Sequence, residues 1–352
     1  MHYRHFPIHN VSVRTDICAF YSDWFMNRVR EGFYDAVDQL RYPDHRIRRQ
    51  LTPGDIFIFW TKNGAPMLPH LRELDERGYH YLWHYTLNGY PAILEPHVPP
   101  REHGIATIHQ LVEHMDRSPD GHGPDRLTHR YDPVPFTSLT PAEWHVKNFD
   151  EIASQLEGRV KRAMVKPVKT VRPYVRERLR ELGHTGIEYY DAYEGSPMLR
   201  VALTGIAESA KRHGMEVGTC REDFDMKPFG LAELTCTSAN LIERTLGIKL
   251  PKDKHPPRDG GCRCYWGPDM GVENTCGHGC VYCYSTFSRT RAARHVANHD
   301  VHGTSLIGNG PHDDAGAAPA PGRGCEGCSM GCDSGICQLL DELLAVLEGD
   351  GK

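Results

Sequence analysis

Short apolar segments alternate with amphipathic ones along the first 220 residues. Apolar segments typical of buried strands are predicted at 11–14, 55–60, 79–86, 127–132, 162–168 and 215–219. Helical spacing of apolar residues predicts helices between them, at 19–30, 65–76, 148–156, 171–182 and 196–213. Repeated βα units imply parallel strands joined by crossover helices. The pattern therefore favours an α/β fold built as a (β/α) barrel, with an open sheet as the alternative.

Polar residues follow several of the predicted strands. In a (β/α) barrel the carboxyl ends of the strands form the mouth of the active site. The candidates are Arg14, Asp16 and Cys18 after the first strand, Lys62 and Asn63 after the second, and Asn88 after the third. Asp and Asn also cap helices well, which is the simpler interpretation for those positions. We predict catalytic roles for Arg14, Asp16, Lys62 and Cys18, although a small buried core residue is the alternative for Cys18, and cofactor contacts for Asn63 and Asn88.

Composition restricts the classes of protein. The chain has 352 residues, of which 39% are hydrophobic, and a net charge of −5, so the whole molecule is not an obvious polyanion binder. No apolar run approaches the ~20 residues that span a bilayer, and the N-terminal residues lack the apolar core of a signal peptide. We therefore expect a cytoplasmic protein without membrane partners. In that reducing compartment, 12 cysteines favour metal binding over disulfides.

One short loop carries three of these cysteines, in the run Cys276-Gly-His-Gly-Cys280-Val-Tyr-Cys283. Three thiolates can hold a [4Fe–4S] cluster and leave one iron open for chemistry. The C-x3-C-x2-C spacing resembles that of the radical S-adenosylmethionine (SAM) superfamily. The resemblance implies a bound SAM, Tyr282 near its adenine, and a reductant such as ferredoxin or flavodoxin. A zinc site completed by His278 is the alternative.

Eight further cysteines divide into two sets of four. Cys220, Cys236, Cys262 and Cys264 suggest an auxiliary [4Fe–4S] cluster, slightly favoured over a structural zinc, while buried apolar cysteines remain the third possibility. Cys325, Cys328, Cys332 and Cys337 follow a low-complexity linker and favour a third cluster or zinc about equally. The predicted division is a barrel with its auxiliary site at 1–310, a flexible linker at 311–324 and a Cys-rich module at 325–352.

The chain resembles the family known as domain of unknown function 1848 over nearly its whole length. The resemblance rests on short stretches, of which the most specific is Asn274-Thr-Cys-Gly-His-Gly-Cys-Val-Tyr-Cys-Tyr284; others are Ser12-Val-Arg-Thr-Asp-Ile17, Phe59-Trp-Thr-Lys-Asn63 and Arg130-Tyr-Asp-Pro133. The family's cysteines look like the radical SAM core motif and include counterparts of Cys220, Cys236, Cys262 and Cys264. The chain departs from the family in having Val13-Arg14 for Arg-Arg, Cys18 for Pro and Gly277 for Pro. Since the cysteine loop comes late in the chain, the resemblance implies a circularly permuted radical SAM barrel.

The substrate is less constrained. The sequence Tyr282-Cys283-Tyr284 is similar to that of spore photoproduct lyases, radical SAM enzymes of DNA repair, which favours a nucleic-acid substrate. The segment 159–180 holds nine Lys or Arg and one acid, and Arg289, Arg291 and Arg294 follow the cysteine loop. A solvated basic helix face explains these charges equally well. The alternatives are a radical enzyme that modifies peptides or small molecules, an electron-transfer protein, and a zinc-stapled binding protein.

Overall fold

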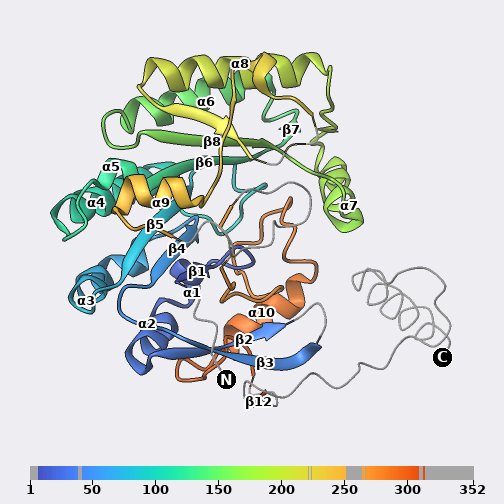
Figure 1. Ribbon diagram of the computed structural model, residues 1–352. Helices are drawn as coiled ribbons and strands as arrows, with labels where there is room; N and C mark the ends of the chain where they lie inside the picture. The colour runs from blue at the N-terminus through green and yellow to red at the C-terminus, as the bar shows by residue number, and fades with distance from the viewer. Residues whose placement is uncertain are drawn as a thin grey trace, which may run out of the picture.

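Seven parallel strands form the central sheet of the computed structural model (Figure 1). The structure describes residues 7–38, 42–220, 222, 224–250, 264–265, 267–308 and 312–313. The strands are β1 (Ile8–Val11), β4 (Ile56–Thr61), β5 (His80–Thr86), β6 (Leu127–Val134), β8 (Arg162–Pro167), β10 (Glu216–Thr219) and β11 (Ala232–Glu233). They lie side by side in chain order, and every pair is parallel. The predicted α/β class with parallel strands is confirmed.

Helices cover one face of this sheet because alternate strand residues point toward them. Phe57, Phe59 and Trp83 belong to a single core with Trp24 and Ile108 of the helices. The helical elements are α1 (Ile17–Phe20), α2 (Ser22–Glu31), η1 (Ala65–His70), α3 (Leu71–Glu76), α4 (Arg101–Arg117), α5 (Gly123–Arg126), α6 (Ala142–Gln155), α7 (Pro173–Glu181), η2 (Leu182–Thr185), α8 (Pro197–Arg212), η3 (Lys227–Phe229), α9 (Ala239–Leu246) and α10 (Arg289–Ala297). Helices α6 and α8 pack side by side over β8 (Figure 1).

The opposite face of the sheet is covered by chain that follows β11. Ile58 and Leu82, which alternate with the helix-facing residues, pack against Ile242 of α9 and against Leu250 and Tyr265. Figure 1 shows α9 crossing in front of the strands. The sheet is therefore buried on both faces, as parallel sheets generally are.

A late segment of the chain extends the sheet beyond its first strand. The amide of Asn10 in β1 donates to the carbonyl of Pro268 at 2.8 Å, and the amide of Met270 donates to the carbonyl of Asn10 at 3.0 Å. The bridge between Asn10 and Asp269 is parallel. The chain runs from this edge directly into the cysteine loop, which is thereby placed near the carboxyl end of β1.

Smaller elements complete the fold. The strands β2 (Phe33–Asp38) and β3 (Tyr42–Gln50) form an antiparallel hairpin that β12 (His312–Asp313) joins, and β7 (Phe136–Thr137) pairs with β9 (Tyr189–Tyr190). In the described part of the chain no helix is long and apolar enough to cross a membrane. The predicted module at 325–352 lies outside the described residues, as does nearly all of the linker at 311–324.

Several predicted elements differ in their bounds. The helix predicted at 19–30 is two helices, since Tyr21 at φ −139° interrupts it. The segment at 65–70 is a 3-10 helix that holds Pro69 within it, and the α-helix begins only at Leu71. The sequence pattern missed α4 and the β2–β3 hairpin altogether.

Candidate functional site

The cysteine loop lies against the residues that follow β4 and β5. Nζ of Lys62 donates to Oε1 of Glu95 at 2.6 Å and to the hydroxyl of Tyr282 at 3.2 Å. Nδ2 of Asn88 donates to the same Oε1 at 3.0 Å and to the same hydroxyl at 3.2 Å. The Tyr282 hydroxyl in turn donates to Glu95. Three predicted site residues, Lys62, Asn88 and Tyr282, therefore meet around one buried carboxylate.

Electrostatics keep both members of the Lys62–Glu95 pair charged. Burial is the largest single effect and favours the neutral form of each, but the attraction between them and the neighbouring interactions together outweigh it. The pKa of Lys62 is accordingly raised, and that of Glu95 is lowered by Lys62 together with hydrogen bonds from Tyr282 and Asn88. Glu95 is 3% exposed, so this is an ion pair removed from water. The cost of burying such a pair is offset here by three hydrogen bonds to Oε1 of Glu95, from Lys62, Asn88 and Tyr282.

A second buried carboxylate, Asp16, fastens the loop to the start of the fold. Its Oδ1 accepts hydrogen bonds from the Thr61 hydroxyl at 2.7 Å and the Ala19 amide at 3.0 Å, so that it caps α1. Its Oδ2 accepts from the Lys62 amide at 2.7 Å and lies 2.8 Å from Nε2 of His278. The N-cap role that the sequence suggested for Asp16 is confirmed, and the same side chain also holds the cysteine loop.

Glycines let the loop approach so closely. Gly279 has φ +70°, which L-residues with a side chain rarely adopt. A Cβ at Gly277 would lie 2.8 Å from the ring of Phe20, which packs edge-on against His278 at 4.8 Å. The cysteine loop is thus built around Phe20.

The three loop cysteines have the donor chemistry of a cluster site. Cys280 is buried; burial raises the pKa of the Cys276 thiol, and the charge of Cys283 raises it further, so these thiols lie near one another. Within the described ranges, no three His, Cys, Asp or Glu side chains gather closely enough to bind one ion. The buried hydroxyls of Ser285 and Thr286, just beyond the loop, have no hydrogen-bond partner among the described residues. Three thiols in one loop, with these hydroxyls just beyond them, provide the donor set that a [4Fe–4S] cluster with one open iron would need.

The other predicted residues at the strand ends lie around this network. Arg14 is half-buried and its charge lowers the pKa of Asp269, although burial, the larger effect, leaves that pKa raised. The side chain of Asn63 accepts a hydrogen bond from the Ala65 amide at 3.3 Å, at the start of η1. Cys18 is fully buried in α1, and burial raises the pKa of its thiol.

The basic helix α7 borders the loop from the other side. Nη2 of Arg178 donates to the carbonyl of Cys283 at 2.9 Å, and the Tyr174 hydroxyl donates to the carbonyl of Tyr284. Arg172, Arg176 and Arg180 are exposed. Arg289 of α10 reaches the carbonyl of Gly279 at 3.5 Å. Of the basic residues noted in the sequence, Arg178 and Arg289 therefore contact the cysteine loop.

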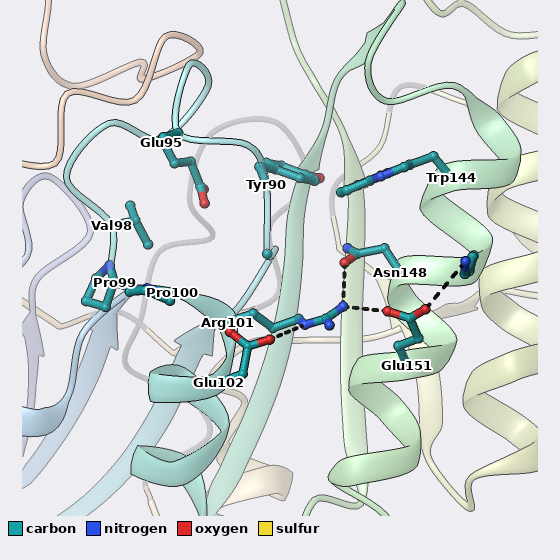
Figure 2. Close-up of a pocket in the computed structure, with 13 residues that line it drawn as sticks. Tyr90, Glu95, Val98, Pro99, Pro100, Arg101, Glu102, Trp144, Asn148 and Glu151 are labelled. Carbon is teal, nitrogen blue, oxygen red and sulfur yellow. Dashed lines mark hydrogen bonds and ion pairs between the residues drawn. The ribbon is translucent and has the colours of Figure 1, made fainter.

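A pocket of about 540 Å³ adjoins the network, and Glu95 is among the residues that line it. Figure 2 shows Tyr90 and Trp144 on one side of it and the ion pair between Arg101 and Glu151, at 2.7 Å, on the other. The ring of Tyr90 packs edge-on against Tyr282 at 6.2 Å. The sequence pattern did not indicate Glu95 or this pocket. No helix was predicted between β5 and β6, where Glu95 and Arg101 lie.

The second cysteine set lies at the carboxyl ends of β10 and β11, the last two strands in the order of the sheet. Cys220 follows β10 and Cys236 follows β11, with their sulfurs 3.3 Å apart, and Cys264 contacts Cys236. Cys262 and the tail cysteines at 325, 328, 332 and 337 lie outside the described residues.

A family model described as "Domain of unknown function (DUF1848)" matches residues 8–285. The chain belongs to this family. The matched range contains the cysteine loop and the set at Cys220, Cys236, Cys262 and Cys264, and it ends before the tail cysteines. No curated protein and no solved structure matches the chain.

Proposed function

We propose that this protein is a radical SAM enzyme whose cluster is held by Cys276, Cys280 and Cys283. The observation that carries the proposal is the position of the loop, which meets Lys62, Asn88 and Glu95 at the carboxyl ends of parallel strands. Ligands of parallel α/β folds bind at that edge. When bound, a cluster with one open iron supplies the electron that cleaves SAM reductively to a 5′-deoxyadenosyl radical.

The permuted barrel is part of the same proposal. The strands run in chain order from β1 to β11, and the segment at 267–270 pairs on the outer side of β1. In space this late segment therefore precedes β1, which is the order that a permuted barrel requires. Circular permutation is tolerated where chain ends lie near one another at a surface.

The protein's own residues position the site. The hydrogen bonds from Lys62 and Asn88 fix the Tyr282 hydroxyl, so its ring, which we assign to the adenine of SAM, has one orientation. Asp16 holds His278 and thereby the middle of the loop. We place Arg14, Asn63 and Cys18 in the same strand-end region, with Arg14 and Asn63 as the nearer candidates for polar contacts because Cys18 is fully buried.

For the substrate, we propose a nucleic acid. The observation that favours it is the exposed basic side of α7, whose Arg178 reaches the carbonyl of Cys283. A row of arginines beside the reacting centre would bind phosphates and leave a base near the loop. A peptide or a small molecule in the pocket beside Glu95 is the alternative, since a volume of about 540 Å³ suits a small ligand.

The decisive experiment is anaerobic reconstitution with iron and sulfide, followed by addition of SAM and dithionite. We expect 5′-deoxyadenosine from the wild-type protein and none from Cys280→Ala. Cys18→Ala, which also removes a buried thiol, is the control for iron content and should keep its full iron. A fully loaded wild-type protein that does not cleave SAM would leave the electron-transfer and zinc-stapled binding functions as the remaining candidates.

Iron stoichiometry tests the cofactor assignment separately. About four irons per chain would mean the loop cluster alone, about eight a second cluster, and about twelve a third. A protein in which zinc alone is found would contradict the proposal for the loop.

A further inference from the structure

A second thiol group lies where β10 and β11 end, and Arg130 and Asp132 connect it to Asn88 of the proposed active site. The sulfurs of Cys220 and Cys236 are 3.3 Å apart, and the amide of Cys236 donates to the sulfur of Cys264 at 3.2 Å. Cys236 is 6% exposed. Three cysteines from separate parts of the chain therefore meet where β10 and β11 end.

Positive charge surrounds these thiols. Nη1 of Arg130 lies 3.6 Å from the sulfur of Cys236, and Nζ of Lys166 donates to the carbonyl of Cys220 at 2.7 Å. Asp132 and Glu222 pair with these two cations.

A third cation, Arg162, is less completely satisfied. Its Nη2 donates to the carbonyl of Thr235 at 2.6 Å, and Glu216 lies 3.7 Å from its Nε. Its Nε and Nη1 have no hydrogen-bond partner among the described residues, although the side chain is buried. A buried guanidinium is costly unless negative charge lies near it. Metal-bound thiolates beside Arg162 would supply that charge.

The distance between the two sulfurs distinguishes the kinds of metal centre. Zinc–sulfur bonds of about 2.3 Å in a tetrahedron place sulfurs about 3.8 Å apart. A disulfide would bring them to about 2.0 Å, and a [4Fe–4S] cube would hold them on different irons and farther apart. The observed 3.3 Å lies nearest to the zinc value.

We propose that Cys220, Cys236 and Cys264 supply three of the four ligands of a single structural zinc ion, in place of the auxiliary iron–sulfur cluster that the sequence favoured. Because no three metal-ligating side chains in the described residues yet converge on one point, binding requires the Cys264 side chain to turn from the Cys236 amide toward the pair. The ion would fasten the chain after β11, which covers the inner face of the sheet through Ile242 and Tyr265. Its role is therefore to close the fold rather than to react.

The test measures zinc and iron per chain on anaerobically purified full-length protein. To remove the zinc that the tail could bind, the parent carries serine at 325, 328, 332 and 337. We expect Cys236→Ser and Cys264→Ser each to lose about one zinc and no iron, and Cys18→Ala to lose neither. The triple variant Cys276→Ala/Cys280→Ala/Cys283→Ala should lose iron and keep zinc, so failure of this proposal and of the radical SAM proposal are distinguishable.

Cobalt substitution of the parent provides a measurement that does not depend on the variants' folding. Tetrahedral thiolate coordination should give visible d–d bands and an intense near-ultraviolet charge-transfer band at about one cobalt per chain. Loss of about four irons in Cys236→Ser, unchanged zinc in a soluble Cys264→Ser, or a parent without those cobalt bands would each overturn the proposal.

Discussion

The ammonium group of Lys62 lies 3.2 Å from the hydroxyl of Tyr282, although the two residues are 220 positions apart in the chain. Lys62 follows the second strand of the sheet, and Tyr282 stands between two cysteines of the late loop. Their contact joins the first part of the fold to the proposed cluster site. The loop is therefore an integral part of the strand-end edge, and its stability should depend on residues near the start of the chain.

Removing the positive charge from this contact should destabilise the protein strongly. Lys62→Met leaves the buried Glu95 carboxylate without its cation, and breaking a buried pair in this way typically costs about 3–5 kcal/mol. The measurement is the free energy of unfolding in urea. The double variant Lys62→Met/Glu95→Gln removes both charges and should recover a large part of the loss. Equal stability of the single and double variants would show that the pair is not coupled.

Neutralising Asp16 should loosen the cysteine loop specifically. Asp16→Asn weakens the contacts to His278 and the Lys62 amide, and hydrogen bonds to a charged group are worth about 1.5–3 kcal/mol each. We expect faster amide hydrogen exchange at 276–283 and a lower iron content after reconstitution. Asp125→Asn is the matched control, since Asp125 forms a surface pair with Lys161 that should contribute under about 1 kcal/mol. Similar effects of the two variants would contradict the special role of Asp16.

Sequence periodicity located most strands because they are buried on both faces. Ile56–Thr61 and His80–Thr86 were predicted to within one residue, since continuous apolar runs between polar ends leave little choice. The first strand was displaced: β1 is Ile8–Val11, and polar His9 and Asn10 within it disguised the pattern. Those two side chains are buried because Tyr34 and Gly267, both distant in sequence, provide their partners.

The site was predictable only in part, for a related reason. Residues directly after strands, such as Lys62 and Asn88, could be inferred from position alone. Glu95 stands seven residues beyond Asn88 in a segment without regular structure, and nothing local distinguishes it from other acids. Its importance arises from the hydrogen bond that Tyr282 donates from across the molecule. Contacts of that range leave no local signal in a single sequence.

The proposed nucleic-acid binding should depend on the exposed arginines of α7 and of its N-cap, Arg172. Arg172→Gln/Arg176→Gln/Arg180→Gln should weaken binding to single-stranded DNA or RNA and reduce the slope of log K against log salt by up to about 0.7 per lost phosphate contact. Fluorescence anisotropy over a salt series provides both quantities. The control Arg72→Gln/Arg117→Gln removes exposed arginines from α3 and α4 and should change neither. A salt slope that the α7 variant leaves unaltered would exclude this helix as the binding surface.

Acid should destabilise the fold through histidines that are buried in their neutral form. Burial lowers the pKa of His129 and of His145 to about 4, against about 6.5 in an unfolded chain. Between these values the unfolded state binds more protons than the folded state, so stability falls as the pH is lowered from about 6.5 to 4. Each histidine contributes a slope of at most about 1.4 kcal/mol per pH unit.

His145, whose Nε2 lies 2.9 Å from the carbonyl of Pro135, is the better one to test because glutamine can retain that hydrogen bond. In urea unfolding between pH 4 and 6.5, His145→Gln should lower the slope of the free energy of unfolding against pH by about one proton's worth. His184→Gln, at an exposed position, should leave that slope unchanged. Equal slopes for His145→Gln and wild type would mean that His145 is already protonated in the folded protein.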